Sequence, residues 1–180
     1  RLCEEVGDQT RLSHALVMLA ASKYIATDFA GARQVLLRGL DVVEGLNAPY
    51  RTADLQNLLA MICLAENDLE SSITYIKQVL DNAMLAKMPY TYWQGLLNAA
   101  TYLFADRQLE LCVRVSVVLD RERAAGSGFD VRYLLNPHLH RLKTAIGDEA
   151  WKTAQNHARS VPVESVFEEV RDVFGNMGSA

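Results

Sequence analysis

Apolar residues recur every three to four positions along most of the chain, and polar residues fill the positions between them. Leu109, Cys112, Val115 and Leu119 form one such set. This spacing places the apolar side chains on one face of an α-helix. No segment alternates apolar and polar residues over five or more positions, which is the pattern expected of a half-buried strand. The sequence therefore predicts an all-α protein.

The helical pattern repeats with a period of 40 residues. Pro49-Tyr50 returns as Pro89-Tyr90, and Asp28-Phe29 returns as Asp68-Leu69 and then as Gln108-Leu109. Each period holds two helical stretches, one break near the Asp-Phe position and one near the Pro-Tyr position, so each unit is a helical hairpin. Such a hairpin cannot bury its apolar faces alone, and stacking on neighbouring hairpins completes the core.

The period divides a single helical-repeat domain, residues 1–180, into units near 10–48, 49–88 and 89–128 and a divergent capping unit at 130–175. The expected helices are near 11–27, 30–45, 50–66, 69–87, 90–105, 108–124, 137–146, 148–160 and 164–174. Pro137 is expected to open a fresh helix with Asn136 as its N-cap. The loop Gly126–Asp130 is the expected hinge or boundary, because it contains the Gly-Ser-Gly segment.

Small and apolar residues occupy corresponding places in successive units. In the first unit these are Leu19-Ala20, Asp28-Phe29, Ala32 and Leu36. In the second unit they are Leu59-Ala60, Asn67-Asp68-Leu69, Ser72 and Ile76. This arrangement resembles tetratricopeptide repeats, although their commonest period is about 34 residues and the Pro that usually ends their second helix is absent. The resemblance implies a right-handed superhelical stack of antiparallel hairpins, a tetratricopeptide-like α-solenoid.

A second resemblance lies in the segment from Arg141 through Trp151 to Val166, with alanines at 150, 154 and 158. It is similar to the motif that closes the helical region of bacterial signal-transduction ATPases and LuxR-type or SARP-type transcription regulators. The resemblance implies a sensing or interaction module of a larger bacterial regulator. The chain begins with Arg1, and we expect it to be an excised piece of such a protein. It contains no phosphate loop of the GxxxxGK[ST] type.

Composition excludes several classes of function. Lys and Arg number 18 against 22 Asp and Glu, a net charge of −4, so no direct contact with nucleic acid is expected. No apolar run approaches the roughly 20 residues that span a bilayer. Cys3, Cys63 and Cys112 are too widely spaced for a disulfide framework or a metal pair. We expect them to be buried apolar residues in a cytoplasmic protein.

The sequence offers little catalytic chemistry. His138 and His140 point about 200° apart on a helix and cannot chelate one ion together, so we expect them to be exposed or at a helix end. His14 and His157 are isolated in the sequence. No GxSxG or HExxH motif occurs. The chain is therefore predicted to be non-enzymatic, without a metal or a cofactor.

Two surfaces are candidates for partner binding. The first is the concave face, where the first helix of each hairpin points inward, with the residues Tyr24, Asp54, Asn57, Met61, Leu64, Gln94, Leu97, Thr101 and Phe104. This face suits an apolar or helical peptide, unless its larger apolar side chains belong to the core. The second is the basic set Arg107, Arg114 and Arg121, which is either a solvated helix face or a contact for an acidic partner or another subunit.

These features predict a module that binds a partner protein or peptide on its concave face. One alternative is a scaffold that associates with its own copy through an end of the array or through the Arg-rich face. A second alternative is a small-molecule effector bound in the groove.

Overall fold

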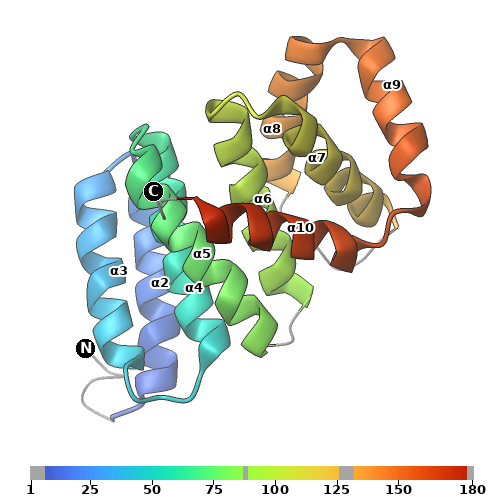
Figure 1. Ribbon diagram of the computed structural model, residues 1–180. Coiled ribbons are helices and arrows are strands. Elements are labelled where there is room, and N and C mark those ends of the chain that lie inside the picture. Colours follow the sequence, from blue (N-terminus) through green and yellow to red (C-terminus); the bar gives the residue numbers. More distant parts are fainter. Residues whose placement is uncertain (1–6, 87–88, 126–131, 178–180) are drawn as a thin grey trace. The chain divides into compact units, whose positions relative to one another are not determined.

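A computed structural model describes residues 7–86, 89–125 and 132–177. Over these ranges the regular structure consists of nine α-helices and one short 3₁₀ helix. Figure 1 labels the α-helices. The predicted all-α class is confirmed for this part of the chain. Cys3, Lys87 and the predicted hinge at 126–130 lie outside the described residues.

The chain divides into two compact units, Arg1–Thr91 (unit 1) and Tyr92–Ala180 (unit 2). The helices of unit 1 are α2 (Gln9–Ile25), α3 (Phe29–Val43), α4 (Pro49–Ala65) and α5 (Leu69–Ala86). The helices of unit 2 are α6 (Pro89–Ala105, except its first three residues), α7 (Leu109–Ala124), α8 (Arg132–Ile146), α9 (Asp148–His157), η1 (Ala158–Ser160) and α10 (Val163–Asn176). Except at α8, these boundaries lie within a few residues of the predicted ones.

Three hairpin turns share one backbone geometry at intervals of 40 residues. Thr27, Asn67 and Arg107 have φ angles of 60°, 59° and 60°. The residue after each donates its N–H to a carbonyl five residues back: Asp28 to Lys23, Asp68 to Cys63 and Gln108 to Leu103, at 2.9, 2.8 and 2.9 Å. These bonds satisfy the last carbonyls of the preceding helix. The period read from the sequence is therefore a repeat of local structure.

The hairpin turns also begin the next helix. The carboxylate of Asp28 accepts the N–H of Gly31 at 2.9 Å, and that of Asp68 accepts the N–H of Ser71 at 3.1 Å. Both bonds satisfy donors that a helix N-terminus leaves open. The hydrogen bond from Lys23, followed by the backbone bond from Gly31, lowers the pKa of the Asp28 carboxyl group. The hydrogen bond from the Ser71 side chain, followed by that from its backbone, lowers the pKa of Asp68.

Unit 1 is a stack of two antiparallel hairpins (Figure 1). Helix α4 packs against both α2 and α3, and α5 packs on α4. The buried apolar residues at the seam are Ala20, Ala32, Leu36, Val43, Leu55, Leu59 and Ile62. The helices approach closely at Gly39, because a Cβ there would lie 2.5 Å from Cδ2 of Leu55. Only glycine fits this contact without moving that leucine.

Unit 2 is organised around α7, which contacts α8, α9, η1 and α10. The thiol of Cys112 donates to the carbonyl of Ala100 at 3.3 Å and so joins α7 to α6. The rings of Tyr102 and Phe174 meet edge to face, with centroids 5.2 Å apart. Cys112, like Cys63 in unit 1, is buried, as predicted.

The predicted start of a helix at Pro137 is wrong. Helix α8 begins at Arg132 and runs through the proline. Its buried positions Leu135, His138, Leu139 and Leu142 follow one helical face across Pro137. Burial of this face outweighs the single backbone bond that the proline removes. Within the described ranges, no helix is long and apolar enough to cross a membrane.

Candidate functional site

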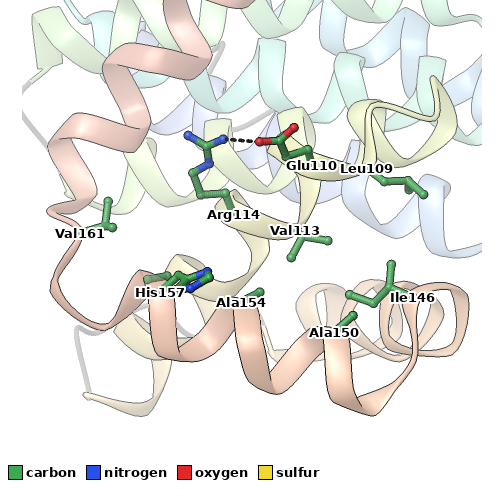
Figure 2. Close-up of a pocket in the computed structure, with 10 residues that line it drawn as sticks. Leu109, Glu110, Val113, Arg114, Ile146, Ala150, Ala154, His157 and Val161 are labelled. Carbon is green, nitrogen blue, oxygen red and sulfur yellow. Dashed lines mark hydrogen bonds and ion pairs between the residues drawn. The ribbon is translucent and has the colours of Figure 1, made fainter.

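Unit 2 contains an apolar groove of about 550 Å³, shown in Figure 2. One wall is the first half of α7, and the other is the end of α8, α9 and the segment that leads into α10. The lining residues are Leu109, Glu110, Val113, Arg114, Ile146, Ala150, Ala154, His157, Ala158 and Val161. The volume lies within the range of about 300–1,000 Å³ typical of ligand sites.

Helical periodicity creates both walls. Leu109 and Val113 are four residues apart on α7, and Ala150, Ala154 and Ala158 follow the same spacing along α9 and η1. Residues at this spacing lie above one another on one helix face. Because three of them are alanines, the α9 wall has short side chains that leave the groove open.

Two charged residues stand beside the apolar lining. Arg114 contacts Glu110 on its own helix at 3.3 Å, an ion pair visible in Figure 2. The same guanidinium donates to both carboxylate oxygens of Glu169 on α10, at 2.9 and 3.1 Å. It therefore ties α10 to α7 at one side of the groove, while the exposed His157 lies on the α9 side.

Arg121 fixes the end of the groove. Its Nη1 donates to the carbonyl oxygens of Ala158 and Val161, each at 2.7 Å. Both acceptors belong to residues that line the groove. The Ala158 carbonyl also accepts the N–H of Val161 at 3.3 Å. A charged donor makes strong hydrogen bonds to such carbonyls. Arg121 thus sets the path of the chain where η1 turns into α10.

The turn between α8 and α9 sets the direction of the second wall. Gly147 has φ 85°, a conformation that favours glycine. Lys143 precedes Gly147 by four residues, and Trp151 follows it by four. The ammonium of Lys143 lies 4.6 Å from the ring centroid of Trp151, which is buried. This cation–π contact joins the two helices, and Ile146 lines the groove at their junction.

The predicted basic set is divided by the structure. Arg107 lies exposed in the hairpin turn before α7, whereas Arg114 and Arg121 lie on α7 and bind groups of unit 2. Their charges hold α10 and η1 in place. Contact of this set with an acidic partner stays a prediction.

In unit 1 the predicted concave-face residues differ in exposure. Asn57 is buried, and Tyr24, Met61 and Leu64 are partly buried. Tyr24 packs its ring against Phe29, with centroids 5.5 Å apart, at the edge of the apolar core. Tyr24 thus contributes to packing, and partner binding by these residues of unit 1 stays a prediction.

In unit 2, Leu97 is buried, and Gln94, Thr101 and Phe104 are partly buried. The Thr101 hydroxyl donates to the carbonyl of Leu97 at 2.9 Å. The Phe104 ring meets the ring of His138 edge to face, with centroids 6.2 Å apart. Phe104 thus contributes to packing as well, and partner binding by these residues stays a prediction.

A polar cluster in unit 1 joins a predicted site residue to a histidine that looked isolated in the sequence. Arg51 lies 3.4 Å from Nδ1 of His14 and 3.8 Å from the carboxylate of Asp54. Burial raises the pKa of Asp54 to about 6, against the opposing charges of Arg51 and His14. The packing of α4 on α2 brings these residues together.

His138 is buried, which corrects the expectation of an exposed or helix-end histidine. A hydrogen bond of 2.8 Å joins its Nε2 to the hydroxyl of Ser116 on α7. Burial, with the nearby charge of Arg141, lowers the pKa of His138 to about 4. The helical spacing of His138 with Leu135, Leu139 and Leu142 was the sequence signal for this burial.

Across the three described ranges, no group of three or more His, Cys, Asp or Glu side chains is arranged to hold a metal ion. Comparisons of the chain with protein families, curated proteins and solved structures find no match.

Proposed function

We propose that this chain is a protein-interaction module without catalytic activity, built as a tetratricopeptide-like array within a larger bacterial regulator. The repeated hairpin turn at Thr27, Asn67 and Arg107 supports the array. The resemblance of the segment 141–166 to regulator sequences supports the context. The observation that carries the binding role is the apolar groove between α7 and α9.

The geometry favours an amphipathic helix as the occupant. Each wall presents residues four apart, which is the spacing with which an apolar helix face interlocks. The wall from Ala150 to Ala158 extends about 12 Å at 1.5 Å per residue, or about two helical turns. The partner therefore needs apolar anchors over about two turns, and the short alanine side chains let its backbone approach closely.

Polar groups at the rim would set the direction of the partner helix. Glu110 on α7 extends into solvent, and its ion pair with Arg114 leaves most of its carboxylate exposed. A Lys or Arg on the partner, beside its apolar stripe, complements this charge. Such rim contacts contribute more to orientation than to affinity.

The test uses a display library of 16-residue amphipathic helices with apolar residues at i, i+4 and i+7. We expect selected peptides to bind the full chain and to lose at least about tenfold in affinity for Ala150→Glu, because a buried carboxylate opposes an apolar anchor. Thr153→Glu is the matched control, since Thr153 is exposed on the same helix outside the groove.

Equal loss in both variants, or in neither, would overturn the groove assignment. Binding that survives Ala150→Glu and disappears in Met61→Gln would instead place the peptide on the predicted concave face. Circular dichroism on each variant separates lost binding from lost folding.

A small apolar effector is the second candidate, favoured by the groove volume. Native mass spectrometry of the purified protein tests it directly. The expected result is a retained small molecule that is absent from Ala150→Glu and present in Thr153→Glu. A mass equal to that of the bare chain in every preparation contradicts this candidate.

A further inference from the structure

Helix α2 presents an uncharged apolar stripe to solvent. Met18, Leu19 and Ile25 are 58%, 48% and 79% exposed, and the exposed Ala15 and Ser22 lie between them. At about 100° per residue, these five positions fall within an arc of about 120°. Large apolar side chains gathered on one exposed face typically mark an interface.

In the second hairpin, the helix face that corresponds to this stripe is buried. Forty residues later, the corresponding positions on α4 are Leu55, Leu59 and Ile62, all fully buried against the preceding hairpin. They correspond to Ala15, Leu19 and Ser22 on α2. The stripe is therefore the stacking face of a hairpin, and in the first hairpin no described residue of unit 1 covers it.

We propose that this stripe binds a second copy of the chain, with the two α2 helices packed antiparallel about a two-fold axis. A two-fold contact places a surface against itself, so a charged face would repel its copy. Between Ala15 and Ile25 the exposed positions of α2 carry no Asp, Glu, Lys or Arg. The exposed faces of α3 and α5 carry charges such as Arg38, Asp41 and Asp81, which makes α2 the most self-compatible of these surfaces.

The residue sizes define the register. An axis near position 20 sets Ile25 of one copy opposite Ala15 of the other, and Met18 opposite Ser22. Ile25 and Met18 then each meet a small side chain, which allows two helices to interlock. Leu19 lies beside its own copy, about 3 Å away along the helix axis at 1.5 Å per residue. The two copies of Ala15 are about 15 Å apart along the same axis.

Sedimentation velocity over a range of concentrations tests the dimer. We expect a concentration-dependent dimer in the wild type and a dissociation constant at least about tenfold higher in Leu19→Glu, because the two new carboxylates face each other. Leu37→Glu is the matched control, since Leu37 on α3 is 44% exposed and lies outside the stripe. A wild type that stays monomeric, or a dimer that Leu19→Glu leaves intact, would overturn the proposal.

A cross-linking experiment tests the register on the folded protein. In a Cys3→Ser background, where Cys63 and Cys112 are buried, a short bismaleimide should couple Leu19→Cys to its own copy. It should not couple Ala15→Cys to itself, yet it should join Ala15→Cys to Ile25→Cys in a mixture. Coupling of Ala15→Cys to its own copy at equal yield contradicts the antiparallel register.

This interface is independent of the proposed groove. Leu19→Glu should keep the affinity of the chain for groove peptides, and Ala150→Glu should keep the dimer. Each proposal can therefore fail without the other, and the two variants identify which one has failed.

Discussion

The two units join their helices in different ways. Unit 1 repeats one hairpin, and the buried core of its seam is apolar from Ala20 to Ile62, with polar contacts such as Arg51 with His14 outside that core. Unit 2 keeps the hairpin turn at Arg107 but joins its helices through polar contacts over long sequence distances, including Arg121 with Val161 and Ser116 with His138. Repetition yields a uniform apolar seam, whereas in unit 2 polar contacts tie α7 to α8, η1 and α10, and the short alanine side chains of α9 leave a groove open beside α7.

The apolar seam of unit 1 is expected to give the largest single effect. Leu59→Ala should lower the free energy of unfolding of unit 1 by about 3 kcal/mol, because it removes a fully buried side chain and leaves a cavity. Leu19→Ala, 40 residues earlier on the exposed stripe, should change it by less than about 0.5 kcal/mol. Hydrogen exchange of unit 1 amides measures both, and equal effects would contradict the assigned seam.

Acid should weaken unit 2 through His138. Its pKa in the folded protein, about 4, lies below the ordinary value of 6.5, so the unfolded chain binds the proton more readily. The contribution of the neutral His138 to the free energy of unfolding of unit 2 is fully present above pH 6.5. It falls by about 3 kcal/mol as the pH drops to 4.

Both tryptophans, Trp93 and Trp151, belong to unit 2, so urea unfolding followed by their fluorescence reports this unit. His138→Gln keeps a polar partner for Ser116 and should flatten the profile between pH 6.5 and 4.5. An equally steep profile in this variant would show that His138 is not the titrating group.

Unit 1 should respond to pH in the opposite direction through Asp54. The pKa of this carboxyl is about 6 in the folded protein and lies above its ordinary value of 3.8. The protonated Asp54 therefore contributes to the free energy of unfolding at low pH, and this contribution is lost as the pH rises through 6. Asp54→Asn should therefore stabilise unit 1 at pH 7 by about 2 kcal/mol, with little change at pH 4. Hydrogen exchange of the variant and the wild type, compared at each pH, measures the difference. A loss of stability at pH 7 would show that the contact with Arg51 outweighs the burial.

The ion pair of unit 2 is expected to give the smallest effect. Arg114 and Glu169 have side chains 39% and 38% exposed, so water screens much of their attraction. Glu169→Gln should lower the stability of unit 2 by about 0.5 kcal/mol, and Glu168→Gln, an exposed neighbour, should leave it unchanged. Tryptophan fluorescence in urea measures both, and a loss several times larger would mean that this pair organises the unit.

Sequence reasoning predicted the helices and their period well because both depend on local patterns. The turn at Thr27, Asn67 and Arg107 is encoded by short segments that recur. Sequence reasoning did not identify the groove, although the alanines at 150, 154 and 158 were visible as a set. Whether small residues line a cavity or allow two helices to touch depends on what lies opposite.

The sequence by itself determined the all-α class, the hairpin turns and the burial of Cys63 and Cys112, because helical spacing and turn chemistry act over a few residues. Only the tertiary structure decided the environments of His138, Arg121 and Pro137. Each of these depends on what another element places opposite it: Ser116 on α7 for the histidine, the carbonyls of η1 and the next turn for Arg121, and the packing that buries one face of α8 for the proline. A polar side chain can hydrogen-bond to water or to another helix, and the packing of the helices decides which partner it has.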